Sequence, residues 1–296
     1  MSISMKKFLA GLLIGLLISV VTAAIWFGQT RTGPAPETAA VPAGEPTDSV
    51  GGDVVSPAFA RASAMFEEAA ASPTVPGISV AIAGRDGVIW SKGFGWADIE
   101  NRVAMSTSTK MRIGSVAKPF TAAALMRLYD QGKIDLDIDV RTYVPAWPEK
   151  HASITLRQLA SHTSGIRHYE NDEFMSNRDY PTVIDSLDIF KESPLKFEPG
   201  SEQSYSTYAW TLVSAAIEGA DGERDFKAIM QQEVFTPLDM QDTAFDQQYA
   251  IISNRQRPYS VDEEKLINTP QTDHSYKWAG GGFIASTSDV ARFAMA

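Results

Sequence analysis

The sequence contains no cysteine, and only four of its 296 residues are histidines. Without cysteine the chain can form no disulfide, no thiolate zinc site and no cysteine nucleophile. The histidines show none of the close spacings, such as His-Glu-x-x-His, that bring two imidazoles onto one metal ion. We therefore expect no metal and no cofactor. The four are His151, His162, His168 and His274.

Positive charge is also scarce, with 26 Lys and Arg residues against 36 Asp and Glu residues and a formal net charge of -10. Nucleic-acid binding needs clustered Lys and Arg to displace counterions from phosphates, and the only basic block is Lys6-Lys7. We expect no nucleic-acid partner. What the chain does have is 44% apolar residues and enough length for a sizeable core.

One long apolar run, Phe8 to Phe27, follows the two lysines. In a helix it would span about 30 Å, the apolar thickness of a bilayer. Its length and the pair Trp26-Phe27 favour an uncleaved single-pass anchor in a bacterial inner membrane, and the lysines orient the rest of the chain outward, into the periplasm. Small residues at Thr22-Ala24 leave a cleaved signal peptide open. We assign residues 1–28 to this anchor or signal peptide.

Residues 29–55 are rich in Pro, Gly, Ala and Thr and show no apolar period, which predicts a disordered tether. A folded domain should occupy residues 56–296. Its patterns predict a helix from Ser56 to Ala71, then a β-hairpin with its turn at Asp86-Gly87. Further helices are expected over 115–132, 155–160, 182–190, 208–218 and 223–234.

This tally is rich in helices, yet the hairpin is its only convincing sheet, and two strands alone are marginal in water. At the other end, "STSDVARFAMA" offers Ser286 and Asp289 as a capping box for a helix that stops without a C-terminal cap. We therefore expect a chain that is truncated at its C-terminus and a sheet that is incomplete.

The stretch "IGSVAKPF" places Ser115 and Lys118 three positions apart at the start of a predicted helix. On a helix this spacing lets the lysine amine reach the serine hydroxyl, and unpaired amides of the first turn can stabilise an oxyanion. Apolar neighbours would lower the lysine pKa enough for it to act as a base. The same spacing recurs at Ser4-Lys7 and Ser193-Lys196, so the alternative is an ordinary helix start with a solvated lysine.

A second element is "FEPGSEQSYSTYAW", where Tyr205 lies on a loop just ahead of a helix. The pair of Ser-x-x-Lys and Tyr205-Ser206-Thr207 resembles the first two motifs of the serine β-lactamase and penicillin-recognising D,D-peptidase superfamily. In its class C-related branch the second motif is Tyr-x-Asn. "LASHTSGIRHYE" and "HSYKWAGGGFIASTSDVARF" narrow the resemblance to the serine β-lactamase-like family. The resemblance implies an α+β fold, with a helical subdomain and an antiparallel sheet flanked by helices.

The resemblance also implies roles for individual residues. Ser115 would be the acylated nucleophile, Lys118 the base that receives its proton, and Tyr205 a second acid/base that passes a proton to the leaving group. Thr207 stands where many relatives have Asn, and would bind Lys118 or substrate, with a plain helix N-cap as the alternative. In "AGGGF" we expect Gly281 and Gly282 to contact substrate, because this segment resembles a glycine-rich turn beside the cleft.

One part of the family pattern is missing from the sequence. The third motif, Lys or His-Thr-Gly on a strand, would lie beyond the segment that resembles Trp278 to Phe293. His162-Thr163-Ser164-Gly165 only superficially matches it, because it follows a predicted helix, and we interpret it as structural. The missing strand would supply a second oxyanion donor, whose loss costs about 10² to 10³ in rate.

Taken together, the motifs predict a membrane-anchored serine hydrolase that forms a covalent acyl-enzyme with a peptide, amide or ester. β-Lactam hydrolysis is one option among these reactions. The substrate would be a small molecule or a peptide. The alternative is a non-catalytic member of the same fold that binds peptidoglycan or serves as a scaffold. The sequence does not indicate an oligomeric state.

Overall fold

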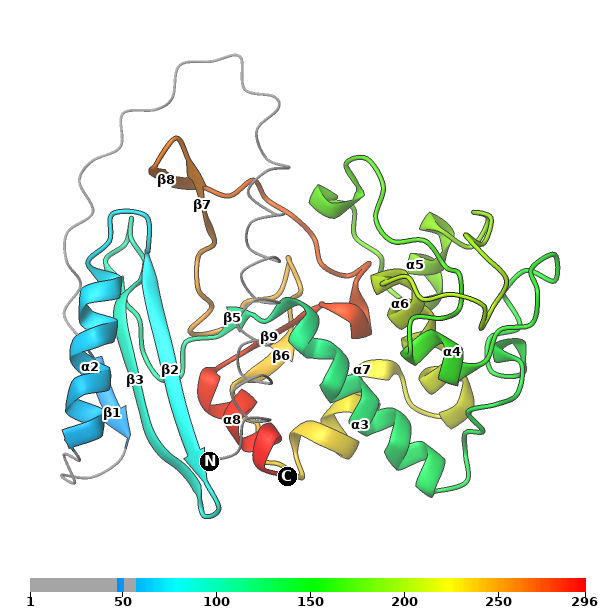
Figure 1. Cartoon of the computed structure of the whole chain (residues 1–296), viewed down its shortest axis with the longest axis horizontal. Helices are drawn as coiled ribbons and strands as arrows, with labels where there is room; N and C mark the ends of the chain where they lie inside the picture. The colour runs from blue at the N-terminus through cyan, green and yellow to red at the C-terminus, as the bar shows by residue number, and fades with distance from the viewer. Residues whose placement is uncertain (1–46, 51–56) are drawn as a thin grey trace. The chain divides into compact units, whose positions relative to one another are not determined.

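The computed structural model describes residues 47–50 and 57–296, which belong to one compact unit, Ala40–Ala296 (Figure 1). The apolar run Phe8–Phe27 and most of the predicted tether lie outside the described residues. Within the described residues, no helix has the length and apolar character needed to cross a membrane.

The α-helices are α2 (Pro57–Ala70), α3 (Ala117–Asp130), α4 (Leu156–Ala160), α5 (Val183–Ser186), α6 (Thr207–Asp221), α7 (Phe226–Met230) and α8 (Thr287–Met295). The strands are β1 (Thr47–Val50), β2 (Gly77–Gly84), β3 (Gly87–Asp98), β4 (Val103–Ala104), β5 (Met111–Arg112), β6 (Thr243–Phe245), β7 (Tyr259–Asp262), β8 (Lys265–Asn268) and β9 (Phe283–Ala285).

The predicted hairpin forms the centre of the first sheet. β2 and β3 pair antiparallel from Gly77 opposite Gly95 to Gly84 opposite Gly87 at the turn. β1 pairs with the other edge of β3, and β4 pairs with the end of β3. Four residues of the predicted tether therefore form a strand, because the free edge of β3 offers unpaired backbone groups.

Two helices cover opposite faces of this sheet. Phe59 of α2 stacks on Trp90 of β3, with ring centroids 5.7 Å apart. On β2, Ser79 pairs with Gly93 and shares a 2.9 Å hydrogen bond with Thr287 of α8. Trp90 and Gly93 are three positions apart on one strand, so Trp90 and the Gly93 partner Ser79 lie on opposite faces of the sheet. Figure 1 shows α2 and α8 on the two sides of the hairpin accordingly.

A second antiparallel sheet, in the order β5-β9-β6, leads the chain into the helical part. Met111 of β5 and Thr243 of β6 both pair with Ala285 of β9. After β5 the chain makes a 3-10 turn, Gly114–Val116, and continues directly into α3. The predicted helix at Ser115 is therefore present, with a 3-10 first turn.

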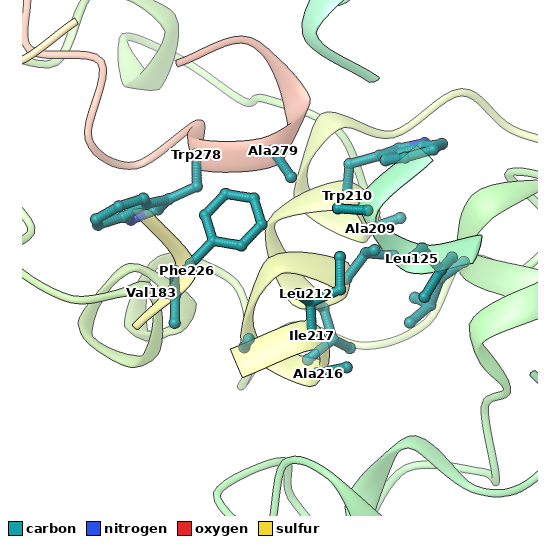
Figure 2. Close-up of a cluster of buried hydrophobic side chains, with 14 of the residues drawn as sticks. Leu125, Val183, Ala209, Trp210, Leu212, Ala216, Ile217, Phe226, Trp278 and Ala279 are labelled. Atoms are coloured by element: carbon teal, nitrogen blue, oxygen red, sulfur yellow. The ribbon is translucent and has the colours of Figure 1, made fainter. Parts of the chain in front are cut away.

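The helical part is organised around α6, which is buried on nearly every side. Figure 2 shows part of the core that surrounds it, which includes Leu212 and Ile217 of α6, Leu125 of α3, and Phe226 next to Trp278. A helix that is buried all round occupies the middle of a domain. This burial fixes both ends of α6, including the loop that precedes it.

The hairpin was the only sheet that the sequence patterns indicated, and the structure adds two small ones. Besides the hairpin sheet and β5-β9-β6, the structure has a two-stranded sheet, β7-β8. The strands of the two added sheets are only two to four residues long. Such strands are too short for an alternating pattern to show, and the partners in β5-β9-β6 are also distant in the sequence.

The predicted helices are present with local differences. The segment 182–190 is α5 followed by a 3-10 turn, and 223–234 is α7 followed by a π-helical turn. At α8, Ser286 caps the helix by accepting from the Asp289 N–H. The other half of the expected box is absent, because the Asp289 carboxylate accepts instead from the Asp242 amide at 2.7 Å and the Thr243 hydroxyl at 2.9 Å. Asp289 thereby ties α8 to β6.

Candidate active site

Ser115 is held at the surface by a helix that is anchored in the core. It lies in the 3-10 turn before α3 and is exposed, whereas Ala117 and Phe120 of α3 are fully buried. Gly114, just before it, has φ +51°, in the left-handed region that favours glycine. The turn therefore presents the serine hydroxyl to solvent from a rigid support.

Two polar groups contact the Ser115 hydroxyl. Lys118 Nζ lies 3.0 Å from Ser115 Oγ, and Tyr205 Oη lies 2.5 Å from the same oxygen. Tyr205 comes from the loop before α6, far away in the sequence. The structure thus brings together the three residues that the two motifs singled out.

The Lys118 amine is enclosed by uncharged groups. Lys118 is 5% exposed, and its Nζ donates to the Gly280 carbonyl at 2.7 Å and lies 4.8 Å from the centre of the Tyr205 ring. Burial lowers the pKa of Lys118, and its interactions with Tyr205 offset only part of that effect. A buried lysine with a lowered pKa can accept a proton from a hydroxyl near neutral pH.

The pKa of the Tyr205 phenol is lowered as well. Burial acts to raise its pKa, but the charge of Lys118 and hydrogen bonds from Lys118 and Ser115 outweigh burial, so the pKa is lowered. The phenol and the amine are thereby both easier to deprotonate than in water. Groups tuned toward neutral pH and within reach of one hydroxyl are suited to acid–base exchange with it.

Thr207 is the first residue of α6 rather than its cap. The N-cap is Ser206, whose Oγ accepts from the Ala209 N–H at 3.0 Å, so the N-cap alternative for Thr207 was wrong by one position. Thr207 Oγ1 lies 3.5 Å from Lys118 Nζ, at the long limit of a hydrogen bond. Its position beside the lysine matches the first of the two roles expected for it.

The glycine-rich turn packs tightly beside these residues. A Cβ on Gly280 would fall 2.4 Å from Thr207 Cγ2, and one on Gly282 would fall 2.9 Å from the Trp278 carbonyl. The amides of Gly281 and Gly282 both donate to that carbonyl. These glycines let the turn approach Lys118 closely, and contact between Gly281 or Gly282 and a substrate stays a prediction.

The competing Ser-x-x-Lys pair at 193–196 does not form such a site. Ser193 Oγ accepts from Arg167 Nε at 2.9 Å, and Lys196 Nζ donates to Ser204 Oγ at 2.8 Å. The two side chains are therefore engaged with different partners. The pair Ser4-Lys7 lies outside the described residues.

Two histidines border Tyr205 that the motifs did not single out as site residues. The His162 ring lies 4.5 Å from the Tyr205 ring, and the His168 ring meets it edge-on at 5.4 Å. The segment 162–165 forms a turn and not a strand, in agreement with its structural interpretation. In the sequence, the one indication that these histidines lie near the site was that both occur in "LASHTSGIRHYE", a segment that carried the family resemblance.

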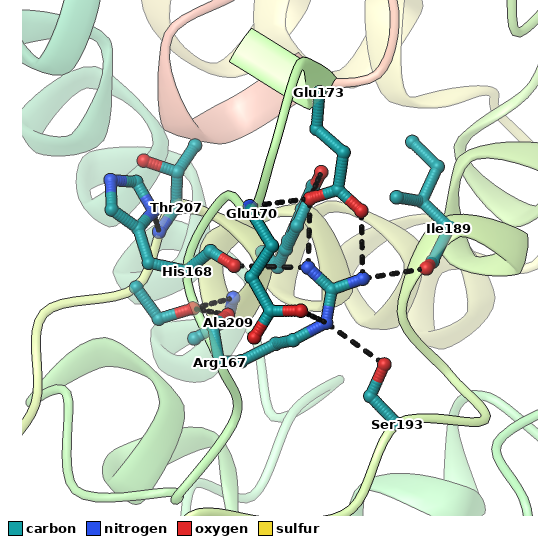
Figure 3. A network of polar contacts seen from close by, with 10 residues as sticks. Arg167, His168, Glu170, Glu173, Ile189, Ser193, Thr207 and Ala209 are labelled. Carbon is teal, nitrogen blue, oxygen red and sulfur yellow. Dashed lines mark hydrogen bonds and ion pairs between the residues drawn. The ribbon is translucent and has the colours of Figure 1, made fainter. Parts of the chain in front are cut away.

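A half-buried ion pair supports this side of the site (Figure 3). The Arg167 guanidinium binds the Glu173 carboxylate with two hydrogen bonds, at 2.8 and 2.9 Å, and donates further to the Ile189 and His168 carbonyls. Its own carbonyl accepts from Ser206 Oγ at 2.7 Å. The network thereby ties the loop 167–173 to the start of α6. Sequence reasoning missed it, because only the fold brings these groups together.

Among the described residues, no group of three or more His, Asp or Glu side chains is arranged to hold a metal ion.

Known proteins resemble this chain over most of its length. The model of the family described as Beta-lactamase matches residues 62–296. The mitochondrial serine beta-lactamase-like protein LACTB of Homo sapiens is 35% identical, over 74% of this chain and 52% of its own length. The chain thus spans about half the length of that curated relative.

Two further relatives extend the comparison. Esterase EstB of Burkholderia gladioli is 27% identical, over 79% of this chain and 68% of its own. The structure of D-amino acid amidase from Ochrobactrum anthropi superposes with a TM-score of 0.70 at 22% identity, over 80% of this chain and 70% of that one. This likeness shows the β-lactamase/D,D-peptidase-like fold. From the family match and the human relative, the chain belongs to the beta-lactamase family.

Proposed function

We propose that this protein is a serine hydrolase that acts on a peptide, amide or ester through a covalent acyl-enzyme on Ser115. The observation that carries the proposal is the contact of one exposed hydroxyl with both a buried lysine amine and a tyrosine hydroxyl. The names of two similar proteins, an esterase and an amidase, support the substrate class. The substrate itself would be a small molecule or a peptide.

The geometry supports a two-step reaction. Ser115 Oγ attacks the substrate carbonyl carbon while neutral Lys118 takes its proton, which gives a tetrahedral adduct. The Tyr205 phenol then protonates the leaving amine or alkoxide as its bond to carbon breaks, and Lys118 returns a proton to the phenolate. A water molecule next attacks the ester, with the same groups moving its proton to Ser115 Oγ.

The oxyanion of the adduct would lie near the start of α3. Within the described residues, the Ser115 amide N–H donates to no backbone or side-chain acceptor. The first amides of a helix carry partial positive charge and lack internal partners. The Ser115 amide is therefore suited to stabilise the developing negative charge.

The test is active-site labelling of the full chain with a fluorophosphonate probe. We expect one phosphonate on Ser115, located by mass spectrometry, and none on a Ser115→Ala variant. Ser193→Ala is the matched control, because Ser193 has the same spacing to a lysine without the same contacts, and it should label like the wild type. Undiminished labelling of Ser115→Ala, or no labelling of the wild type, would contradict the proposal.

We further propose that residues 1–28 anchor the hydrolase domain, residues 56–296, to a membrane and that the domain faces outward. The support is the apolar run Phe8–Phe27 behind Lys6-Lys7. Protease added to intact bacterial spheroplasts should then digest the domain. Resistance to protease until the spheroplasts are lysed would contradict this orientation.

A further inference from the structure

The loop that carries Tyr205 runs along the turn 162–165 and is bound to it by backbone hydrogen bonds. The amides of Ser204, Gly200 and Lys196 donate to the carbonyls of residues 162, 163 and 165 at 2.9, 2.8 and 2.8 Å. A Cβ on Gly165 would fall 2.4 Å from the Phe197 carbonyl, so only glycine permits this approach. The turn therefore sets where the Tyr205 loop lies.

Two imidazoles add hydrogen bonds to this attachment, just after Tyr205 in the chain. His162 Nδ1 accepts from the Ser206 amide at 3.1 Å, and His168 Nδ1 accepts from the Thr207 amide at 3.2 Å. The two amides directly follow Tyr205 in the chain. Since each Nδ1 is an acceptor, each neutral ring carries its proton on Nε2.

His162 holds this position at a conformational cost. Its φ is +62°, in the left-handed region that non-glycine residues seldom adopt. Such backbone geometry persists where the surrounding contacts over-determine it. Here those contacts are the Tyr205 ring and the Ser206 amide.

Resting on the proposed function, we propose that His162 and His168 are positioning residues, which hold the Tyr205 hydroxyl on Ser115 only while both imidazoles are uncharged. Protonation would place an N–H on Nδ1, directly opposite the backbone N–H that it now accepts from. Both hydrogen bonds would be lost, and the loop would be released from the turn. Neither histidine exchanges a proton with substrate.

The surroundings of the two rings keep them uncharged at neutral pH. Burial lowers the pKa of both, that of His168 to about 4, and the charge of Lys118 lowers both further. His168 also faces Lys196 and Lys277. Its own segment supplies the Tyr169 ring, 4.1 Å away and tilted against it, and the Arg167–Glu173 pair. On acidification each ring must gain a proton beside these cations, so the attachment is intact at neutral pH and lost as pH falls through the folded pKa.

Substitutions can separate the acceptor from the ring. In His162→Asn and His168→Asn the amide oxygen can replace Nδ1 as an acceptor and does not titrate. In His162→Phe the ring remains and the acceptor is lost. Using the full chain and an anilide, whose leaving amine must be protonated, kcat/KM is measured at pH 8.

We expect the Asn variants to stay within about tenfold of the wild type at pH 8, and His162→Phe to lose about 10²-fold, as for a misplaced catalytic group. Equal losses in the Asn and Phe variants would overturn the proposal.

A second measurement does not depend on turnover or on the Phe variant folding. In the Ser115→Ala protein, imidazole ¹⁵N shifts should show both rings neutral with the proton on Nε2 at pH 7, and a depressed pKa on titration. Protonated Nδ1 atoms at pH 7 would overturn the proposal. Failure of the hydrolase function would instead appear as an unlabelled Ser115 in the wild type, with these shifts unchanged.

Discussion

At the scale of single residues, environment distinguishes Ser115-Lys118 from the other copies of the same spacing. Lys118 is 5% exposed and contacts a carbonyl, a hydroxyl and a ring, whereas Lys196 is bound to Ser204 at the surface. The spacing and the loop position of Tyr205 could be recognised in the sequence. The histidine contacts could not, because each joins side chains to backbone amides about forty positions away that only the fold brings near.

Removing the Tyr205 hydroxyl should affect the reaction according to its leaving group. Tyr205→Phe keeps the ring contacts with Lys118 and His162 but cannot protonate a leaving amine. We expect kcat/KM for an anilide to fall by about 10² to 10⁴-fold, and for a nitrophenyl ester by much less. Tyr249→Phe, at a tyrosine that is 78% exposed, is the control. Equal losses on both substrates would show that Tyr205 does not act on the leaving group.

Lys277 is a second buried lysine near the site. It is 6% exposed, and its amine lies 4.3 Å from the centre of the Phe174 ring and 5.1 Å from that of Tyr276. Burial, assisted by the charge of Arg112 and opposed by that of Asp246, lowers its pKa to about 7. The folded state therefore binds the Lys277 proton more weakly than the unfolded state does, and the charge destabilises the fold.

Lys277→Met should consequently stabilise the protein at acidic pH. The destabilisation is complete below pH 7, where Lys277 is charged in both states, and fades as pH rises toward the unfolded pKa near 10.5. Each kcal/mol relieved should raise Tm by about 2 to 4 °C. Thermal melts at pH 6 and 9 check this, with the exposed Lys265→Met as control. A gain that grows with pH would contradict it.

At the scale of elements, helices with local end signals could be predicted and short strands could not. α4 begins at a capping box of Thr155 and Gln158, and α8 at the Ser286 cap, all within a few residues. β5 and β9 instead exist because Met111 meets Ala285 across the sequence. No pattern within a two-residue strand can signal such a partner.

Gly219 in α6 tests how tightly that central helix is packed. By helix propensity alone, Gly219→Ala should stabilise the helix by about 1 kcal/mol. However, the added Cβ would fall 1.9 Å from the Tyr143 carbonyl, so we expect a net loss of about 1 to 3 kcal/mol in the free energy of unfolding. Gly84→Ala, whose nearest new contact would be 3.5 Å away on Ile89, is the control. Urea unfolding measures both, and a stabilised Gly219→Ala would disprove the tight contact.

At the scale of the whole described unit, the site depends on one shared core. The α3 residue Phe120, the α6 residue Tyr208 and the turn residue Ala279 belong to the same buried cluster. The groups around the nucleophile, at positions 115–118, 162–168, 205–207 and 280, come from separate parts of the chain. None of these segments can hold the others without that core, which also explains why the sequence shows the motifs but not their assembly.

Labelling of Ser115 should therefore disappear together with the core as urea is added. Trp147, Trp210 and Trp278 are all buried in that cluster, so tryptophan fluorescence reports its unfolding. We expect the urea midpoint for loss of fluorophosphonate labelling to coincide with the fluorescence midpoint, because coincident transitions indicate one cooperative unit. If the loop that carries Tyr205 opened on its own, labelling of Ser115 would be lost at lower urea while the fluorescence stayed native. That result would place the Tyr205 loop outside the cooperative core and limit the core's role to holding α3 and α6.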